Sequence, residues 1–112
     1  MKNMRRIFLI LTLLLPVTVL VSSASAETKI EATIFSYDGE DFVRTTTTLS
    51  TEGQAATGTK LDRDSSAYKA LVEKRSYTGP ATILGGDYQA NYAPLTGADG
   101  QLTGALFVGV PK

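Results

Sequence analysis

From Lys29 onward the chain alternates apolar and polar side chains in short runs, a pattern typical of β-strands with one buried face. In the first run Ile30, Ala32 and Ile34 fall on one side of the strand, and Thr33 and Phe35 fall on the other. β-Branched and aromatic residues dominate these runs, as strands favour. The sequence therefore predicts strands over residues 29–36, 41–49, 81–84, 88–95 and 102–110.

Between the second and third predicted strands the apolar spacing becomes helical. Ala67, Ala70 and Leu71 recur at intervals of three and four residues, and Asp64 or Ser65 is placed to cap a helix over residues 64–74. Residues 50–59, which include Gly53 and Gly58, read as a loop. Turn-forming residues separate the other elements at 37–40, 85–87 and 96–100.

The predicted order is β-β-α-β-β-β, which indicates an α+β fold. Short turns join the last three strands, so we expect an antiparallel meander within a five-stranded sheet that carries its helix on one face. The last strand is apolar in both registers, with Leu106, Val108 and Val110 on one side and Ala105 and Phe107 on the other. The face without the helix should therefore stay partly apolar, and we expect it to be an association surface for a homodimer or a membrane receptor.

The first 26 residues have the order of a secretory signal peptide. Lys2, Arg5 and Arg6 precede an apolar stretch over residues 7–21, and the small residues Ala24-Ser25-Ala26 follow it. The apolar stretch is short for a membrane span and contains Pro16. We therefore expect cleavage after Ala26 and a periplasmic or secreted product in which residues 27–112 form one small domain.

Charge and composition exclude several classes of function. Without residues 1–26 the chain keeps all 11 acids but only 8 of its 11 basic residues, so its net charge is −3 and it shows no basic patch for nucleic acid. The whole sequence contains no Cys and no His. A Ser-His-Asp triad, a Cys-His pair and a typical zinc site are therefore excluded, and neither a metal nor a cofactor is expected.

One candidate binding site lies on the second predicted strand. Arg44, Thr46 and Thr48 are two residues apart, so an unbroken strand places them on the same face. A guanidinium beside hydroxyls suits a small carboxylate. An arginine on an edge strand in contact with water explains the pattern equally well at this point.

The tyrosines form a second group of candidates. Tyr88 and Tyr92 share a strand face with Ala90 between them, so their phenols are placed to line the floor of a cavity. Ordinary core packing with the hydroxyls at the rim is the alternative. Tyr77 is a further candidate, whereas Tyr68 on the predicted helix is expected to cover the sheet.

The chain from Ala32 to Val110 resembles the Cache domains, the extracytoplasmic PAS-like sensor modules of bacterial chemoreceptors and sensor kinases. The most specific part of this resemblance is at the end of the chain. It consists of a Tyr-x-Pro strand end at Tyr92–Pro94, the Asp99-Gly100 turn, and the strand Gly104-Ala105-Leu106-Phe107-Val108-Gly109. Three other segments share the resemblance, at residues 41–47, 57–61 and 76–81. Within this class the chain is most similar to the single-Cache ectodomains of methyl-accepting chemotaxis proteins.

The resemblance implies a non-catalytic module that binds small organic acids or amino acids and acts in signal transduction. It also favours Arg44 as part of a pocket. Family members often carry an arginine where Ala55 stands here, and they begin with a long N-terminal helix for which the predicted cleavage site leaves no room. The alternative is a structural or interaction protein with a Cache fold and a filled pocket. A hydrolase using Glu40 and Asp41 is disfavoured, because neighbouring residues on a strand point apart.

Overall fold

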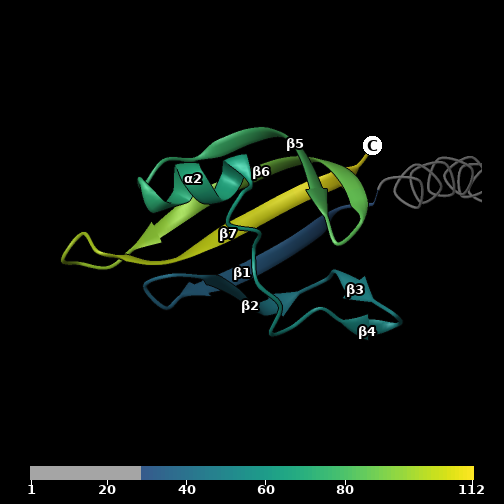
Figure 1. The fold of residues 1–112 in the computed structure, drawn as a ribbon, viewed down its shortest axis with the longest axis horizontal. Coiled ribbons are helices and arrows are strands. Elements are labelled where there is room, and N and C mark those ends of the chain that lie inside the picture. The colour runs from purple at the N-terminus through teal and green to yellow at the C-terminus, as the bar shows by residue number, and fades with distance from the viewer. Residues whose placement is uncertain (1–28) are drawn as a thin grey trace, which may run out of the picture.

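Five strands form one antiparallel sheet in the computed structural model, which describes residues 29–112 (Figure 1). The predicted signal peptide, its cleavage after Ala26 and the predicted lack of a long N-terminal helix lie outside these residues. The sheet has the order β2-β1-β7-β6-β5, so the first and last strands of the chain are neighbours at its centre. The strands are β1 (Glu31–Tyr37), β2 (Phe42–Thr47), β5 (Tyr77–Ile83), β6 (Gly86–Thr96) and β7 (Leu102–Pro111).

The predicted meander of the last three strands is confirmed. Short turns connect β5 to β6 and β6 to β7, and each pair is antiparallel over its length. Strand β5 begins at Tyr77, four residues earlier than predicted, and includes Pro80. A proline is compatible with this strand because β5 is at the edge of the sheet, where one side of the backbone needs no hydrogen bond.

The pairing of β1 with β7 requires a glycine at one position. Gly104 lies opposite Ser36, and a Cβ atom on Gly104 would be 2.2 Å from the carbonyl oxygen of Phe35. Any larger residue would therefore push the two central strands apart. This close approach explains one glycine of the Gly104–Gly109 motif.

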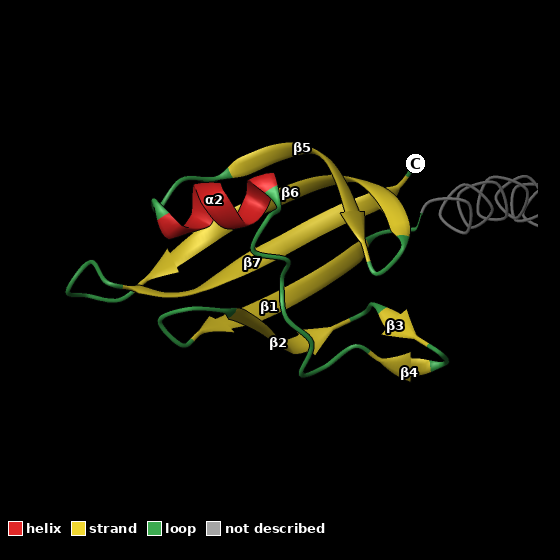
Figure 2. Cartoon of the chain, viewed as in Figure 1, coloured by secondary structure: helices red, strands yellow, loops and turns green. Residues whose placement is uncertain are grey.

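Helix α2 (Ser66–Val72) lies across β5 and β6 on one face of the sheet (Figures 1 and 2). Ser65 is the N-cap, and its hydroxyl accepts a hydrogen bond from the backbone N–H of Tyr68. Ala67, Ala70 and Leu71 are buried beneath the helix, as their spacing predicts. The α+β fold with a helix on one face, predicted from the sequence, is thus confirmed.

The core lies on the face of the sheet that carries the helix, which we call the inner face. Tyr92 and Phe107 pack with their ring centres 5.0 Å apart, and Phe35 joins them from β1. Residues 58–61 run beside β2 and pair with it through backbone hydrogen bonds, and Leu49 and Leu61 are buried in the core. Residues 50–59 were predicted as a loop, but they contain a small hairpin of β3 (Ser50–Thr51) and β4 (Gln54–Ala55).

Candidate functional site

A cavity of about 490 Å³ opens on the inner face between the edge strand β5, the start of α2 and the segment at residues 60–65. Three of the residues predicted from the sequence line it together, namely Arg44, Tyr77 and Tyr92. They come from β2, β5 and β6, so the cavity spans most of the width of the sheet. Asp62 and Asp64 also line it, at positions exposed to solvent.

Arg44 is buried, with only 3% of its surface exposed, so the interpretation as an edge arginine in water is wrong. Its Nη1 atom donates hydrogen bonds to the Thr59 hydroxyl at 3.0 Å and to the Lys60 carbonyl at 3.2 Å. Its Nε atom is the one buried side-chain nitrogen or oxygen among residues 29–112 without a hydrogen-bond partner.

No carboxylate neutralises this guanidinium within the described part of the chain, where every ion pair involves Lys60, Arg63 or Arg75. The ring of Phe35 offsets part of the cost of burying this charge, because its centre lies 5.2 Å from the Arg44 guanidinium carbon. Burial lowers the pKa of Arg44, although an arginine remains protonated at neutral pH. The cavity wall therefore holds a positive charge that lacks an anionic partner.

Tyr92 and Tyr77 contribute two phenols to the same cavity, and their ring centres lie 6.4 Å apart. Only 1% of Tyr92 is exposed, and burial raises its pKa to about 12 while the nearby Arg44 opposes that rise. The Tyr92 hydroxyl therefore stays protonated and able to donate a hydrogen bond. The Tyr77 hydroxyl donates to the Pro80 carbonyl at 2.6 Å, which leaves its oxygen lone pairs as acceptors. Tyr92 thus combines the two roles that the sequence left open, core packing and cavity lining.

Thr46 and Thr48 do not share the face of Arg44, so that part of the predicted site is wrong. A β-bulge interrupts the pairing of β1 with β2, because Phe35 lies opposite Arg44 whereas Ile34 lies opposite Thr46. The extra residue in β2 reverses the alternation of faces beyond it. Thr46 and Thr48 therefore line a different hollow, on the opposite side of the sheet.

Tyr88 also lies outside the main cavity. It packs edge-to-face against Phe107 and borders a smaller hollow beside Asp87 and Lys112. The strand alternation correctly placed Tyr88 and Tyr92 on one face. Both rings pack on Phe107, at centre distances of 6.3 Å and 5.0 Å, but only Tyr92 lines the main cavity.

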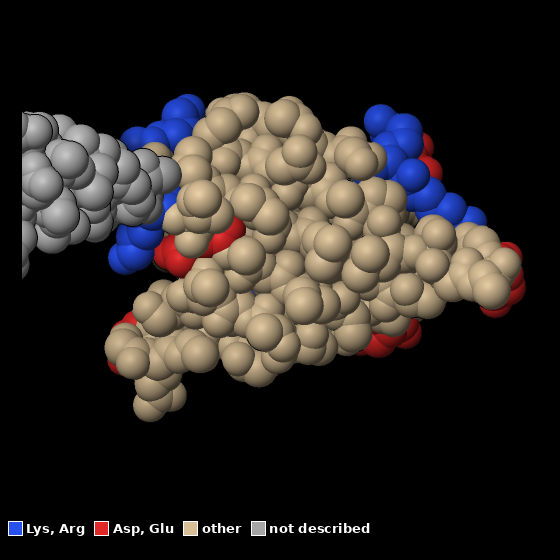
Figure 3. Space-filling model, turned by 180° about the vertical axis from the view of Figure 1, so that it is seen from behind, with Lys and Arg blue, Asp and Glu red and all other residues tan. Residues whose placement is uncertain are grey.

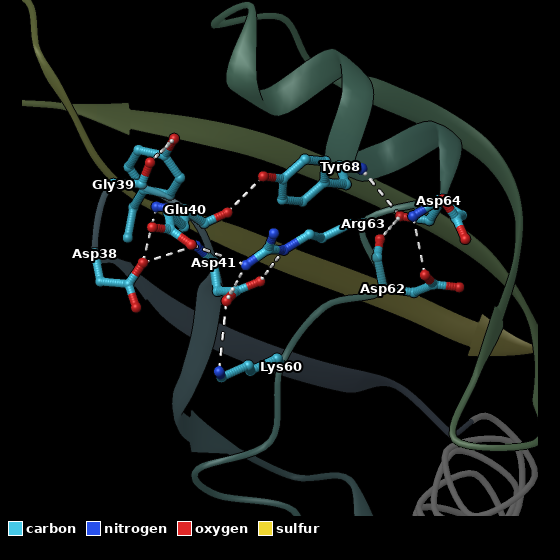
Figure 4. Close-up of polar contacts among 11 residues, drawn as sticks. Asp38, Gly39, Glu40, Asp41, Lys60, Asp62, Arg63, Asp64 and Tyr68 are labelled. Atoms are coloured by element: carbon cyan, nitrogen blue, oxygen red, sulfur yellow. Dashed lines mark hydrogen bonds and ion pairs between the residues drawn. The ribbon is translucent and has the colours of Figure 1, made fainter.

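A polar cluster next to the cavity holds its rim segment in place (Figure 4). The carboxylate of Asp41 accepts two hydrogen bonds from Arg63, from Nε at 2.8 Å and from Nη2 at 2.9 Å, and Lys60 lies 3.4 Å away. The hydrogen bonds from Arg63 lower the pKa of Asp41 to about 2. Sequence reasoning missed this pair because 22 residues separate its members and nothing in the local pattern relates them.

The same cluster ties helix α2 to the β1–β2 turn. The Tyr68 hydroxyl donates to the Glu40 carbonyl (Figure 4). The Tyr68 ring packs edge-to-face on Phe42. Asp38 accepts the backbone N–H groups of Glu40 and Asp41, which orients this turn. Both walls of the cavity that lie outside the sheet, residues 60–65 and α2, are thus fastened to one turn.

Residues 29–112 offer neither a metal site nor a membrane-spanning helix. These residues contain no group of three acidic, histidine or cysteine side chains that would hold a metal ion. The one helix they form is too short to cross a bilayer. The chemistry available in the cavity is therefore that of a buried guanidinium, phenols, hydroxyls and rim carboxylates.

The antiparallel sheet, the helix on one face and the cavity between them define a PAS-like sensor domain of the Cache class. The chain belongs to the Cache 3/Cache 2 fusion domain family, whose model matches residues 17–112. Searches of curated proteins and of solved structures found no match. The predicted Cache resemblance is confirmed, and with it an extracytoplasmic module of a class that binds small ligands for sensing.

Proposed function

We propose that this domain is a non-catalytic sensor that binds a small organic acid or amino acid through Arg44 in the inner-face cavity. The observation that carries this proposal is the buried Arg44 guanidinium, whose Nε atom has no partner and whose charge has no nearby carboxylate. A buried charge is costly unless it is paired. A ligand carboxylate supplies both the missing negative charge and the missing hydrogen-bond acceptor.

The rest of the cavity fits the same ligand class. Its volume of about 490 Å³ lies within the range of about 300–1,000 Å³ that small-molecule sites occupy. The protonated hydroxyl of Tyr92 is a second donor for a carboxylate, and Tyr77 offers an acceptor. The Asp62 and Asp64 side chains at the opening favour an amino group at the other end of the ligand, which is the feature that separates amino acids from simple acids.

In this proposal the protein acts in signal transduction after export. The sequence of residues 1–26 supports a signal peptide that is removed after Ala26, which would release the domain into the periplasm or outside the cell. The absence of Cys and His from the whole chain supports a role without catalysis. A second copy of the domain or a membrane receptor would transmit the signal.

Thermal-shift screening against organic acids and amino acids tests the proposal. A ligand that binds only the folded state at 100 times its Kd stabilises it by about 2.7 kcal/mol. For a domain of this size that corresponds to a rise in Tm of about 10 °C or more. Inorganic anions and uncharged analogues of each compound are the controls. A panel without any response would favour the alternative, a Cache fold whose pocket does not bind.

A further inference from the structure

The cavity that Arg44 lines has one polar wall and one apolar wall. The polar wall is the segment at residues 60–66, which is charged or carries a hydroxyl at every lining position except Leu61. The apolar wall is the end of β5 and the first residue of the turn after it. Its apolar lining residues are Pro80, Ala81, Ile83 and Leu84. Thr82 lies among them, and its hydroxyl is occupied because it donates to the Asp87 carboxylate at 2.9 Å.

Leu84 is the residue of this wall that the core does not bury. Its neighbour Ile83 is 4% exposed and packs in the core, whereas Leu84 is 45% exposed. Within residues 29–112 Leu84 is the one exposed large apolar residue that lines the cavity. Its apolar surface is therefore available to a bound ligand.

Most of the other exposed apolar side chains lie elsewhere. Ile34, Leu106 and Val108 border the hollow on the face of the sheet opposite α2, where the visible charged side chains lie toward the margins (Figure 3). This confirms the expectation that the face without the helix stays partly apolar. Leu84 does not border that hollow, so its exposure belongs to the cavity and not to that face.

The backbone at Leu84 is a second, independent observation. Leu84 and Gly85 form the two-residue turn between β5 and β6, with φ angles of 50° and 83°. Such turns favour Asn-Gly or Asp-Gly, because a bulky side chain is sterically unfavourable at positive φ. The β3–β4 hairpin has the same kind of turn at Glu52 and Gly53, with φ angles of 52° and 78°, and there the first residue is polar. The hairpin itself therefore does not explain a leucine at position 84, and residues held in this way cluster at ligand sites.

We propose that the ligand carries an aliphatic group and that Leu84 selects for it, covering this group at the cavity mouth while Arg44 binds the carboxylate. The inference rests on the proposed function, because Arg44 must hold one end of the ligand for Leu84 to contact the other. Arg44 and the residues before Leu84 belong to the two outermost strands of the sheet, β2 and β5. The end of β5 curves across the sheet (Figure 1), and Leu84 lines the same cavity as Arg44.

This arrangement favours aliphatic amino acids and monocarboxylates over dicarboxylates. An aliphatic group that leaves water against Ile83 and Leu84 gains affinity in proportion to its apolar area. A second carboxylate would lie between the apolar wall, which cannot hydrogen-bond it, and the exposed carboxylates of Asp62 and Asp64, which repel it.

Calorimetric titration with two series of increasing chain length tests the inference. The first series is alanine, 2-aminobutyrate and norvaline, and the second is propanoate, butanoate and pentanoate. For the wild-type protein we expect the Kd to fall about two- to fourfold per added methylene, since a fully buried methylene gives about fourfold. Leu84→Asn should flatten this dependence, so that norvaline and pentanoate bind about fourfold or more weakly while alanine and propanoate keep their Kd within about twofold.

The same variant separates a ligand contact from a structural role. Asparagine suits the positive φ of this turn, so the Tm of Leu84→Asn should equal or exceed that of wild type. The matched control is Glu52→Asn, the same replacement at the same position of the β3–β4 turn outside the cavity, and it should keep the full chain-length dependence. Leu84→Gly, which also accommodates a positive φ, is the second variant should Leu84→Asn fail to fold.

The outcomes distinguish this inference from the proposed function. Equal Kd values along each series, or succinate binding as tightly as pentanoate, would overturn the aliphatic site while leaving carboxylate binding by Arg44 in place. A Leu84→Asn protein that keeps the full dependence, or that loses stability with its ligand series unchanged, would overturn the role of Leu84. Wild-type protein that binds no member of either series and no other carboxylate would overturn both proposals.

Discussion

Arg44 and Phe35 lie directly opposite each other on β2 and β1, and the guanidinium carbon of Arg44 is 5.2 Å from the centre of the Phe35 ring. The aromatic face offsets part of the cost of burying the cation, but it supplies no acceptor for Nε. The pair therefore holds the charge in position without neutralising it. This is the arrangement that a site for an anionic ligand requires before the ligand arrives.

Replacing Arg44 by methionine should abolish the thermal response to any carboxylate that the wild-type protein binds. Methionine fills a similar space and removes a buried unpaired charge, so we expect the free energy of unfolding to change by less than about 1.5 kcal/mol. Urea denaturation and thermal-shift titration of the same preparations measure the two quantities. Thr46→Val, on the face of the sheet opposite α2, is the control and should bind like wild type. A large loss of stability with an intact ligand response would assign Arg44 a structural role.

Tyr92→Phe should weaken ligand binding about 10-fold or more, because a hydrogen bond to a charged group contributes about 1.5–3 kcal/mol. Burial keeps the Tyr92 hydroxyl protonated at neutral pH, with a pKa of about 12. The matched control is Tyr88→Phe, since Tyr88 borders a different hollow. Calorimetric titration gives both affinities. Equal losses for the two variants would contradict the separation of Tyr88 from the site.

Asp41 should make the stability of the protein fall as the pH drops from about 4 to about 2. The pKa of Asp41 is about 2 in the folded protein, below the value of about 3.9 for an unfolded chain. The stabilisation is thus present above pH 4 and is lost as the pH falls through the folded pKa. Asp41→Asn should show a smaller drop in Tm across this window than wild type. Glu52→Gln, in the exposed β3–β4 hairpin, should keep the wild-type profile, and an unchanged profile for Asp41→Asn would argue against the Arg63 contact.

Gly104→Ala should destabilise the fold by about 1–3 kcal/mol or more, because the added methyl group meets the Phe35 carbonyl oxygen of the neighbouring strand. Backbone on both sides prevents the clash from relaxing cheaply. Gly97→Ala is the control, since its Cβ would contact only the side chains of Asp99 and Thr103. We expect that control within about 0.5 kcal/mol of wild type in urea denaturation. Equal stabilities would mean that β1 and β7 do not pair in this register.

Local patterns in the sequence were enough to predict the main elements of this fold, but not the β3–β4 hairpin. Apolar alternation predicted the five strands of the large sheet, and helical spacing with Asp64 or Ser65 as the cap predicted α2. These features depend on residues close together in the chain. The largest boundary error was at Tyr77–Pro80, where an edge strand tolerates a proline.

The candidate site was predicted only in part, for two physical reasons. One extra residue in β2 turns Thr46 away from Arg44, and a bulge of this kind is defined by the partner strand rather than by the sequence around it. The Asp41–Arg63 pair forms only when the chain has folded, since its members are 22 residues apart. Arg44 was found because it lies among threonines on a predicted strand, but its hydrogen bonds to Thr59 and Lys60 form only when that distant segment pairs beside β2.

The most direct test of the account is to follow the side-chain Nε–H resonance of Arg44 by NMR in arginine-labelled protein. Saturating the protein with a carboxylate found in the thermal-shift screen should shift this resonance and slow its exchange with water. The corresponding signal of Arg75, which is exposed and paired with Glu73, should stay unchanged. A ligand that raises the Tm while leaving the Arg44 resonance where it was would contradict the claim that Arg44 holds the ligand.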